Sequence, residues 1–151
     1  MLGSLLSTIK KEVKFLDKMY FFLLFLSVSF ILFYGKYRCD HIKDHKDLLD
    51  FDIFKNSRKY ELNGWSISHL LFYMLLGYLY HEVLFITMFL SIIWELLETF
   101  VGKYKPKFMD GWGFCQTEKK QTKVWWYGKF SDPFINLFGL LLGSHLYRYL
   151  H

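Results

Sequence analysis

The sequence predicts an all-α membrane protein: a polytopic helical bundle of about four transmembrane helices with an amphipathic helix at its N-terminus. Composition supports this, because hydrophobic residues make up 53% of the 151 residues and aromatic residues 22%. Patterning supports it further, because charged residues gather in a few segments that alternate with apolar runs close to bilayer-spanning length. A chain of this length has room for one domain.

The positive charge of the chain leaves its type of partner open at first. A net charge of +5 is compatible with nucleic-acid binding. However, the sequence contains no basic helix, zinc-ligand spacing or RNA-binding signature. Lysines and arginines beside apolar runs are more typical of headgroup contacts and membrane topology. We therefore expect the lipid bilayer, and no nucleic acid, as a partner.

The first eighteen residues are expected to form an amphipathic surface helix. Residues 2–18 place apolar side chains at i, i+3, i+4 and i+7, with lysines on the other faces, a pattern typical of helices that lie on a membrane. The transmembrane domain then covers 19–151, and its first span, 19–34, is uncharged. The polar step at Asp17 predicts a bend between the two segments; one continuous helix is the alternative.

Three further spans follow. Their predicted bounds are 67–80, 83–101 and 133–149. Ser66 and Asp132 are suited to cap the helices that follow them, and Gly102 is suited to end the third span. His81-Glu82 is so short a link that the second and third spans must form an antiparallel hairpin. Small residues at Gly139 and Gly143 predict close helix packing.

Two polar loops, 35–65 and 102–130, lie on one side of this topology. They carry most of the lysines and arginines, so the positive-inside rule places them in the cytosol. Cys39 and Cys115 fall in different loops. They can pair only if the fold brings them together in an oxidising compartment.

The topology also brings polar side chains of three helices to one depth at the loop side. These residues are His69, Glu95, Glu98, Asp132 and Asn136. Carboxylates in membrane helices are costly and usually face an interior cavity, where a cation can neutralise their repulsion. Oxygen ligands suit a hard divalent cation such as calcium, and a neutral histidine beside it suits a general base.

Each of these residues also has a purely structural interpretation. Asp132 can be a helix cap, Asn136 a hydrogen-bond partner of a neighbouring helix, and His69 an interfacial histidine. Glu98 can be solvated near the loop lysines, whereas Glu95, which lies deeper, is the hardest to explain in this way.

Several motifs resemble those of the base-exchange phosphatidylserine synthases of eukaryotic endoplasmic reticulum. The octapeptide S-I-I-W-E-L-L-E at 91–98 resembles the family's S-I-x-W-E-L-x-E segment, and His69 precedes it as the family histidine does. Pro106-Lys107-Phe108-Met109-Asp110 is similar to the family's P-x-F-x-E. The pair Trp125-Trp126 and the later Asp132 and Asn136 also look similar.

The resemblance implies a phosphatidyl transferase that exchanges serine for the choline or ethanolamine of a phospholipid, with calcium. By this resemblance His69 and Glu95 are the catalytic residues, and the ligands of the cation are Glu95, Glu98, Asp110, Asp132 and Asn136. The lysines 103, 105 and 129 and the tryptophan pair would hold the headgroup. The implied location is the endoplasmic reticulum, if the source is eukaryotic.

The chain also departs from this family. Family members are much longer, Tyr127 replaces an aspartate after the tryptophan pair, and an insertion covers roughly 111–124. A weaker likeness to VanZ-like small membrane proteins implies no settled chemistry. A non-enzymatic subunit of a membrane complex and a small channel or transporter therefore remain alternatives, and four short helices suggest a homo-oligomer.

Overall fold

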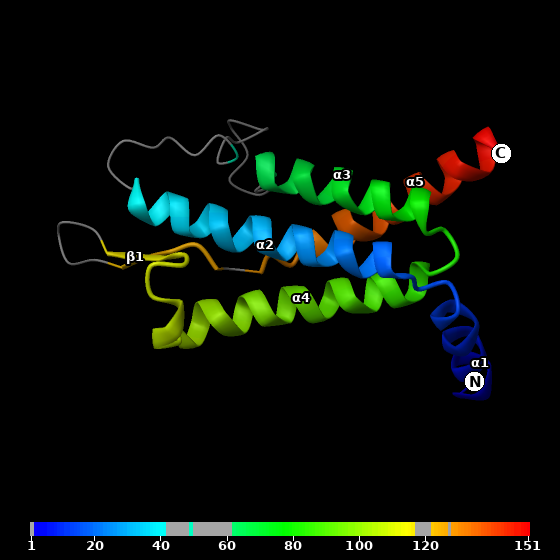
Figure 1. Ribbon diagram of the computed structural model, residues 1–151, viewed down its shortest axis with the longest axis horizontal. Coiled ribbons are helices and arrows are strands. Elements are labelled where there is room, and N and C mark those ends of the chain that lie inside the picture. Colours follow the sequence, from blue (N-terminus) through cyan, green and yellow to red (C-terminus); the bar gives the residue numbers. More distant parts are fainter. Residues whose placement is uncertain (1, 42–48, 50–61, 117–121, 127) are drawn as a thin grey trace.

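The computed structural model describes residues 2–41, 49, 62–116, 122–126 and 128–151, and it is mostly helical, as an all-α protein is (Figure 1). Its helices are α1 (Leu2–Val13), α2 (Lys18–Asp40), α3 (Gly64–Leu79), α4 (Leu84–Tyr104) and α5 (Asp132–Leu150). A single 3-10 turn, Lys107–Met109, leads to a small hairpin of β1 (Phe114–Gln116) and β2 (Thr122–Val124), antiparallel with Phe114 opposite Val124. The predicted loop 35–65 lies mostly outside the described residues.

The chain bends between α1 and α2, as the sequence suggested. Asp17 caps α2, because its carboxylate accepts a hydrogen bond from the Tyr20 amide at 2.8 Å. One continuous helix through this point is therefore wrong. At its other end α2 continues to Asp40, well beyond the predicted end of the first span at residue 34.

The helix ends around the predicted hairpin differ in detail from the sequence interpretation. Asn63, rather than Ser66, caps α3: its side chain accepts from the Ser66 amide at 3.3 Å, while the Ser66 hydroxyl accepts from the Asn63 amide. Helix α4 runs through Gly102 and ends where Lys105 adopts a left-handed conformation. A Cβ at Gly102 would overlap the Trp126 carbonyl oxygen, so this glycine permits close packing of the later loop.

Helices α3 and α5 form the most closely packed pair of the bundle. A Cβ at Gly139 would lie 2.7 Å from the Leu70 carbonyl oxygen, and one at Gly143 would overlap the Met74 carbonyl oxygen. Gly77 of α3 meets the Leu140 backbone in the same way. Small residues thus let the two backbones approach, as the spacing of Gly139 and Gly143 predicted.

Several polar side chains lie inside this bundle, and many large apolar ones lie on its outside. Among the described residues the buried set includes Thr87, Ser91, Glu95, Asp132, Asn136 and Ser144. The exposed set includes phenylalanines and leucines of every long helix, among them Phe25, Leu71, Leu96 and Phe138. Two of the described helices, α2 and α4, are long and apolar enough to cross a membrane.

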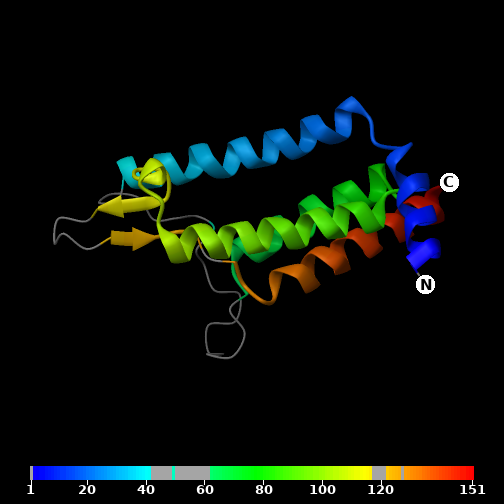
Figure 2. The ribbon, with the colours of Figure 1, turned by 90° about the horizontal axis from the view of Figure 1, so that it is seen from below.

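Helix α2 is attached to the rest of the molecule mainly at its two ends. Its buried residues are Tyr20 at one end and Gly35 and Arg38 at the other. The Tyr20 hydroxyl lies 2.9 Å from that of Thr87, and a disulfide joins Cys39 to Cys115 of β1. Figure 2 shows α2 along one side of the molecule, with α3, α4 and α5 together on the other.

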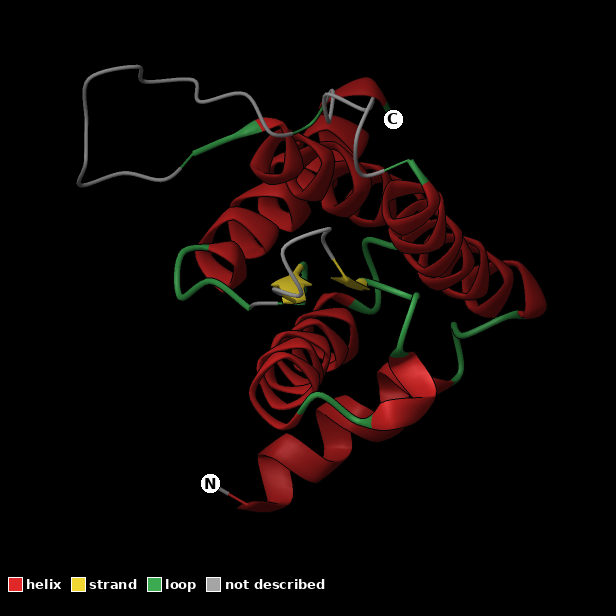
Figure 3. Cartoon of the chain, turned by 90° about the vertical axis from the view of Figure 1, so that its left-hand side faces the viewer, coloured by secondary structure: helices red, strands yellow, loops and turns green. Residues whose placement is uncertain are grey.

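Seen from the end of the bundle that carries β1 and β2, the strands lie among the helix ends (Figure 3). The segment after β2 continues across α4, because a Cβ at Gly128 would lie 2.5 Å from the Glu95 carbonyl oxygen. The loop end of the bundle is therefore covered by a chain segment directly above the buried glutamate.

Candidate metal and proton-transfer site

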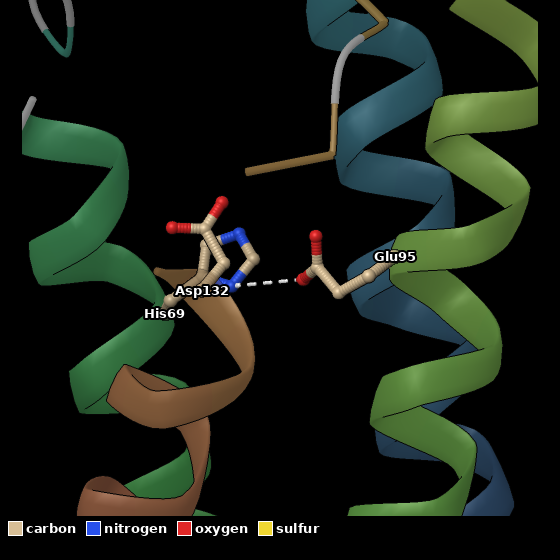
Figure 4. Close-up of side chains that lie close together, drawn as sticks. All are labelled: His69, Glu95 and Asp132. Carbon is tan, nitrogen blue, oxygen red and sulfur yellow. Dashed lines mark ion pairs between the residues drawn. The ribbon is translucent and has the colours of Figure 1, made fainter. Parts of the chain in front are cut away.

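Three side chains from three helices meet near the loop end of the bundle (Figure 4). His69 lies in the second turn of α3, Glu95 in α4, and Asp132 is the first residue of α5. Each offers a nitrogen or carboxylate oxygen, and these atoms all lie within 4.8 Å of one another. The closest pair drawn is His69 Nδ1 and Glu95 Oε1, at 3.7 Å.

Asp132 does not cap α5, contrary to the sequence prediction, so its carboxylate is available to this cluster. The N-cap position of α5 is occupied by Ser131, and Pro133 follows in the first turn. The Ser131 hydroxyl donates to Asp132 Oδ1 at 3.3 Å. The carboxylate sits at the N-terminal end of α5, which is the positive end of the helix dipole.

Asn136 lies fully buried behind His69 and determines how that ring is held. Its amide nitrogen donates to the Ser91 hydroxyl at 2.8 Å and to Glu95 Oε1 at 3.4 Å. The remaining amide oxygen lies 3.0 Å from His69 Nδ1 and can only accept, so Nδ1 carries the proton. In the neutral imidazole, Nε2 of His69 then carries the lone pair that a base or a metal ligand needs.

Glu95 is the member of the cluster whose carboxylate is least satisfied. Its side chain is 6% exposed, and among the described residues Oε2 has no hydrogen-bond partner. An unpartnered buried carboxylate oxygen is costly, and a cation or a proton removes that cost. The donors of Glu95, Asp132 and His69 fit a divalent cation, and both cysteines are consumed by the disulfide, so no thiolate competes.

Two other predicted ligands have different positions. Glu98, one turn beyond Glu95, lines a polar cavity together with His69 and Asp132. Asp110 is exposed beyond α4, next to the first strand, and does not line this cavity. The structure therefore brings together His69, Glu95, Glu98, Asp132 and Asn136, and leaves Asp110 apart.

The polar cavity, of about 70 Å³, also contains a basic group that the sequence did not single out, Arg38. Arg38, 4% exposed, stacks on the Trp125 ring, and its guanidinium carbon lies 5.9 Å from the centre of the Trp65 ring. Lys129 completes the basic lining. Arg38 was missed because 35–65 was interpreted as a loop. A helix continued through Tyr34 would have placed Arg38 on the same face one turn later.

The remaining headgroup residues suggested by the resemblance divide into two sets. Trp125 lines the polar cavity beside Arg38, and Trp126 lines it while its indole NH donates to the Trp112 carbonyl oxygen at 2.7 Å. Lys103 and Lys105 are exposed and do not line it. Tyr127 lies outside the described residues.

A second, apolar cavity of about 350 Å³ lies between the middle of α2 and the α3/α4 pair. Its walls include Leu24 and Val28 from α2, Phe72 from α3 and Leu90 from α4. It shares Ile31, Trp65 and His69 with the polar cavity, so the two adjoin at the histidine.

Comparison with known proteins adds no relative. The sequence matches no protein-family model and no curated protein, and the fold matches no solved structure. The likeness to phosphatidylserine synthases therefore rests on the motifs described above, and function must be inferred from the geometry of the site.

Proposed function

We propose that this chain is an integral, multi-pass membrane protein in which α2, α3, α4 and α5 all cross the bilayer. The inside-out distribution of its side chains supports this, because lipid can cover exposed phenylalanines and leucines that water cannot. The glycine-mediated contact of α3 with α5 is of the kind that drives helix association in lipid. A location in the endoplasmic reticulum, if the source is eukaryotic, is part of this proposal.

We further propose that the protein exchanges phospholipid headgroups, replacing choline or ethanolamine by serine with the help of a divalent cation. The observation that carries this proposal is the buried His69–Glu95–Asp132 cluster, with an unpartnered Glu95 oxygen, at the junction of a polar and an apolar cavity. A phospholipid likewise combines a polar headgroup with apolar acyl chains. The motif resemblance points to the same chemistry.

In this proposal Glu95 and Asp132 hold the cation, calcium by the resemblance, with Glu98 at the same cavity. When bound, the cation would neutralise phosphate charge and polarise the phosphodiester. His69 Nε2 takes the proton of the serine hydroxyl as the serine oxygen bonds to phosphorus, and that proton passes to the alcohol oxygen of the departing choline or ethanolamine. Asn136 keeps the imidazole in the required tautomer throughout.

The test is incorporation of labelled serine into phosphatidylcholine vesicles that contain the purified protein, with calcium or with a chelator. We expect calcium-dependent incorporation by the wild type and none by Glu95→Gln. The matched control is Glu82→Gln, because Glu82 is a partly exposed carboxylate in the link between α3 and α4. Absence of incorporation with calcium, magnesium and manganese would refute the exchange reaction and favour the non-enzymatic alternative.

A further inference from the structure

The apolar cavity exists because α2 contacts the rest of the molecule mainly at its two ends. The helix is fixed at one end by the buried Tyr20 and at the other by Gly35, Arg38 and the Cys39–Cys115 disulfide. Between these points it has no buried residue, and Leu24, Val28 and Ile31 line the cavity. The two anchors thus hold a groove open between them.

The groove has the size and lining of a ligand site for an apolar chain. Its volume of about 350 Å³ falls within the usual range for small-molecule pockets. The lining is mostly aliphatic and aromatic, with a few small hydroxyl residues such as Ser27 and Thr87. A bilayer supplies one abundant occupant of this shape, a lipid acyl chain, and an empty apolar space of this size would be destabilising.

The charge next to the groove indicates which lipid. Arg38 and Lys129 line the polar cavity that adjoins the groove at His69, together with the carboxylates of Glu98 and Asp132, which the proposed cation would neutralise. Arginine presents several donors in a planar fork that matches phosphate oxygens, and the stack on Trp125 holds that fork in place. A molecule that fills both cavities therefore has an apolar chain and an anionic phosphate, with the phosphate beside the His69–Glu95–Asp132 cluster.

We infer that the groove between α2 and the α3/α4 pair binds one acyl chain of a phospholipid whose phosphate contacts Arg38 and Lys129 in the adjoining polar cavity. This rests on the proposed function for the identity of the substrate, but it adds an acyl-chain groove and a role for Arg38 that none of the sequence motifs marks. Arg38 is its phosphate-positioning residue.

The experiment measures phospholipid retained by the detergent-purified protein in native mass spectrometry, after incubation with equal amounts of phosphatidylcholine and of diacylglycerol, which has no phosphate. Val28→Trp fills the groove, and we expect it to reduce retention of both lipids at least about tenfold. Ser27→Leu fills the same groove with less bulk and should act in the same direction. The matched control is Leu26→Trp, since Leu26 is exposed on α2 and does not line the groove.

The phosphate contact is tested in the same mixture with Arg38→Gln. We expect the wild type to prefer phosphatidylcholine over diacylglycerol, and Arg38→Gln to reduce that preference by about tenfold while diacylglycerol retention is unchanged. Retention of phosphatidylcholine by both folded groove variants at the wild-type level would overturn the groove. An unchanged preference in Arg38→Gln would overturn the phosphate contact.

The outcome separates this inference from the exchange reaction. Lipid retention that depends on Val28 and Arg38, without any serine incorporation, would support the binding site and refute the reaction. Serine incorporation that is insensitive to both groove variants would support the reaction and refute the binding site.

Discussion

The two ends of the helical bundle contain different kinds of side chains. The end with the α3–α4 link contains the apolar core, a cluster whose buried members are Tyr20, Tyr73, Leu76, Val83 and Leu140. The loop end contains buried carboxylates, an imidazole, an arginine and the polar cavity. Packing supplies stability at one end, whereas the other end buries charge and leaves space, both of which are destabilising.

Carboxylates occur at both ends, but they are satisfied differently. At the link end the Glu12 carboxylate accepts from the Phe85 and Ile86 amides, and Asp17 accepts from the Tyr80 hydroxyl at 3.0 Å. At the loop end Glu95 Oε2 has no hydrogen-bond partner among the described residues. We propose that the first end holds the fold together and that the second end binds a ligand.

The largest expected effect is a loss of exchange activity at the loop end while the fold remains intact. His69→Gln removes the base while keeping a hydrogen-bonding side chain, so we expect labelled-serine exchange to fall by about 10²- to 10⁴-fold. The thermal midpoint should change little. The matched control, His145→Gln, alters an exposed histidine of α5 and should retain activity. Comparable losses in the two variants would show that His69 has no special role.

The next effect breaks the fold at the link end and leaves the chemistry intact. Leu76→Ala opens a cavity in the apolar core and should lower stability by about 2–5 kcal/mol. Leu75→Ala, which changes a neighbouring side chain that is 45% exposed, should lower it far less. Melting curves measure both. A fall in exchange per folded molecule in Leu76→Ala would contradict the division between the two ends.

The disulfide gives an intermediate effect. Cys39 and Cys115 are 76 residues apart, and removing the link with Cys39→Ser should lower stability by about 2–4 kcal/mol. Because α2 is then anchored mainly at Tyr20, phospholipid retention should fall as well. Melting curves and native mass spectra with and without reductant measure both quantities. A variant that melts and binds lipid like the wild type would show that the link does not hold the groove.

The same disulfide predicts which side of the membrane each end of the bundle faces. Disulfides persist in oxidising compartments, so we expect the loop end, and the site, on the non-cytosolic side. The positive-inside count predicts the opposite orientation. The C-terminus lies at the link end (Figure 1), so a tag after His151 should be digested by protease added from the cytosolic side. Protection of that tag would support the charge count instead.

The smallest effect concerns the docking of α1. Glu12→Gln removes the charge that two amides at the α4 N-terminus bind, and we expect a loss of about 0.3–1 kcal/mol. Lys11→Gln, at an exposed position of the same helix, should have no effect. Melting curves of the two variants test this. Equal midpoints for Glu12→Gln and the wild type would show that this cap contributes nothing.

The sequence was most informative where local pattern decides structure. The apolar runs predicted the positions of the long helices, and the Asp17 step predicted the bend. Helix ends were predicted less well, since charged residues after 34 were interpreted as a loop. In the structure that segment continues as helix because Gly35 and Arg38 are buried against the loop that follows α4. Such a contact between distant segments leaves no local signal.

The site shows the same division. Because successive helices run in opposite directions, the sequence was enough to predict that His69, Glu95 and Asp132 lie at one depth in the bundle. The rotation of each helix about its axis was not predictable, and it decides that Asn136 hydrogen-bonds both His69 and Glu95. The position of Asp110 depends on the 3-10 turn and the strands, which the helical pattern does not describe.

The central claim is that Glu95 serves a cation at the loop end rather than the stability of the fold. The most direct test is the thermal midpoint of the wild type and of Glu95→Gln across a calcium titration, repeated with magnesium. Calcium should raise the wild-type midpoint by mass action and raise that of Glu95→Gln far less. In chelator the variant should melt at the same temperature or higher, because one member of a repelling carboxylate set is gone. Equal responses of the two proteins to both cations, or a variant that is less stable under every condition, would contradict the account.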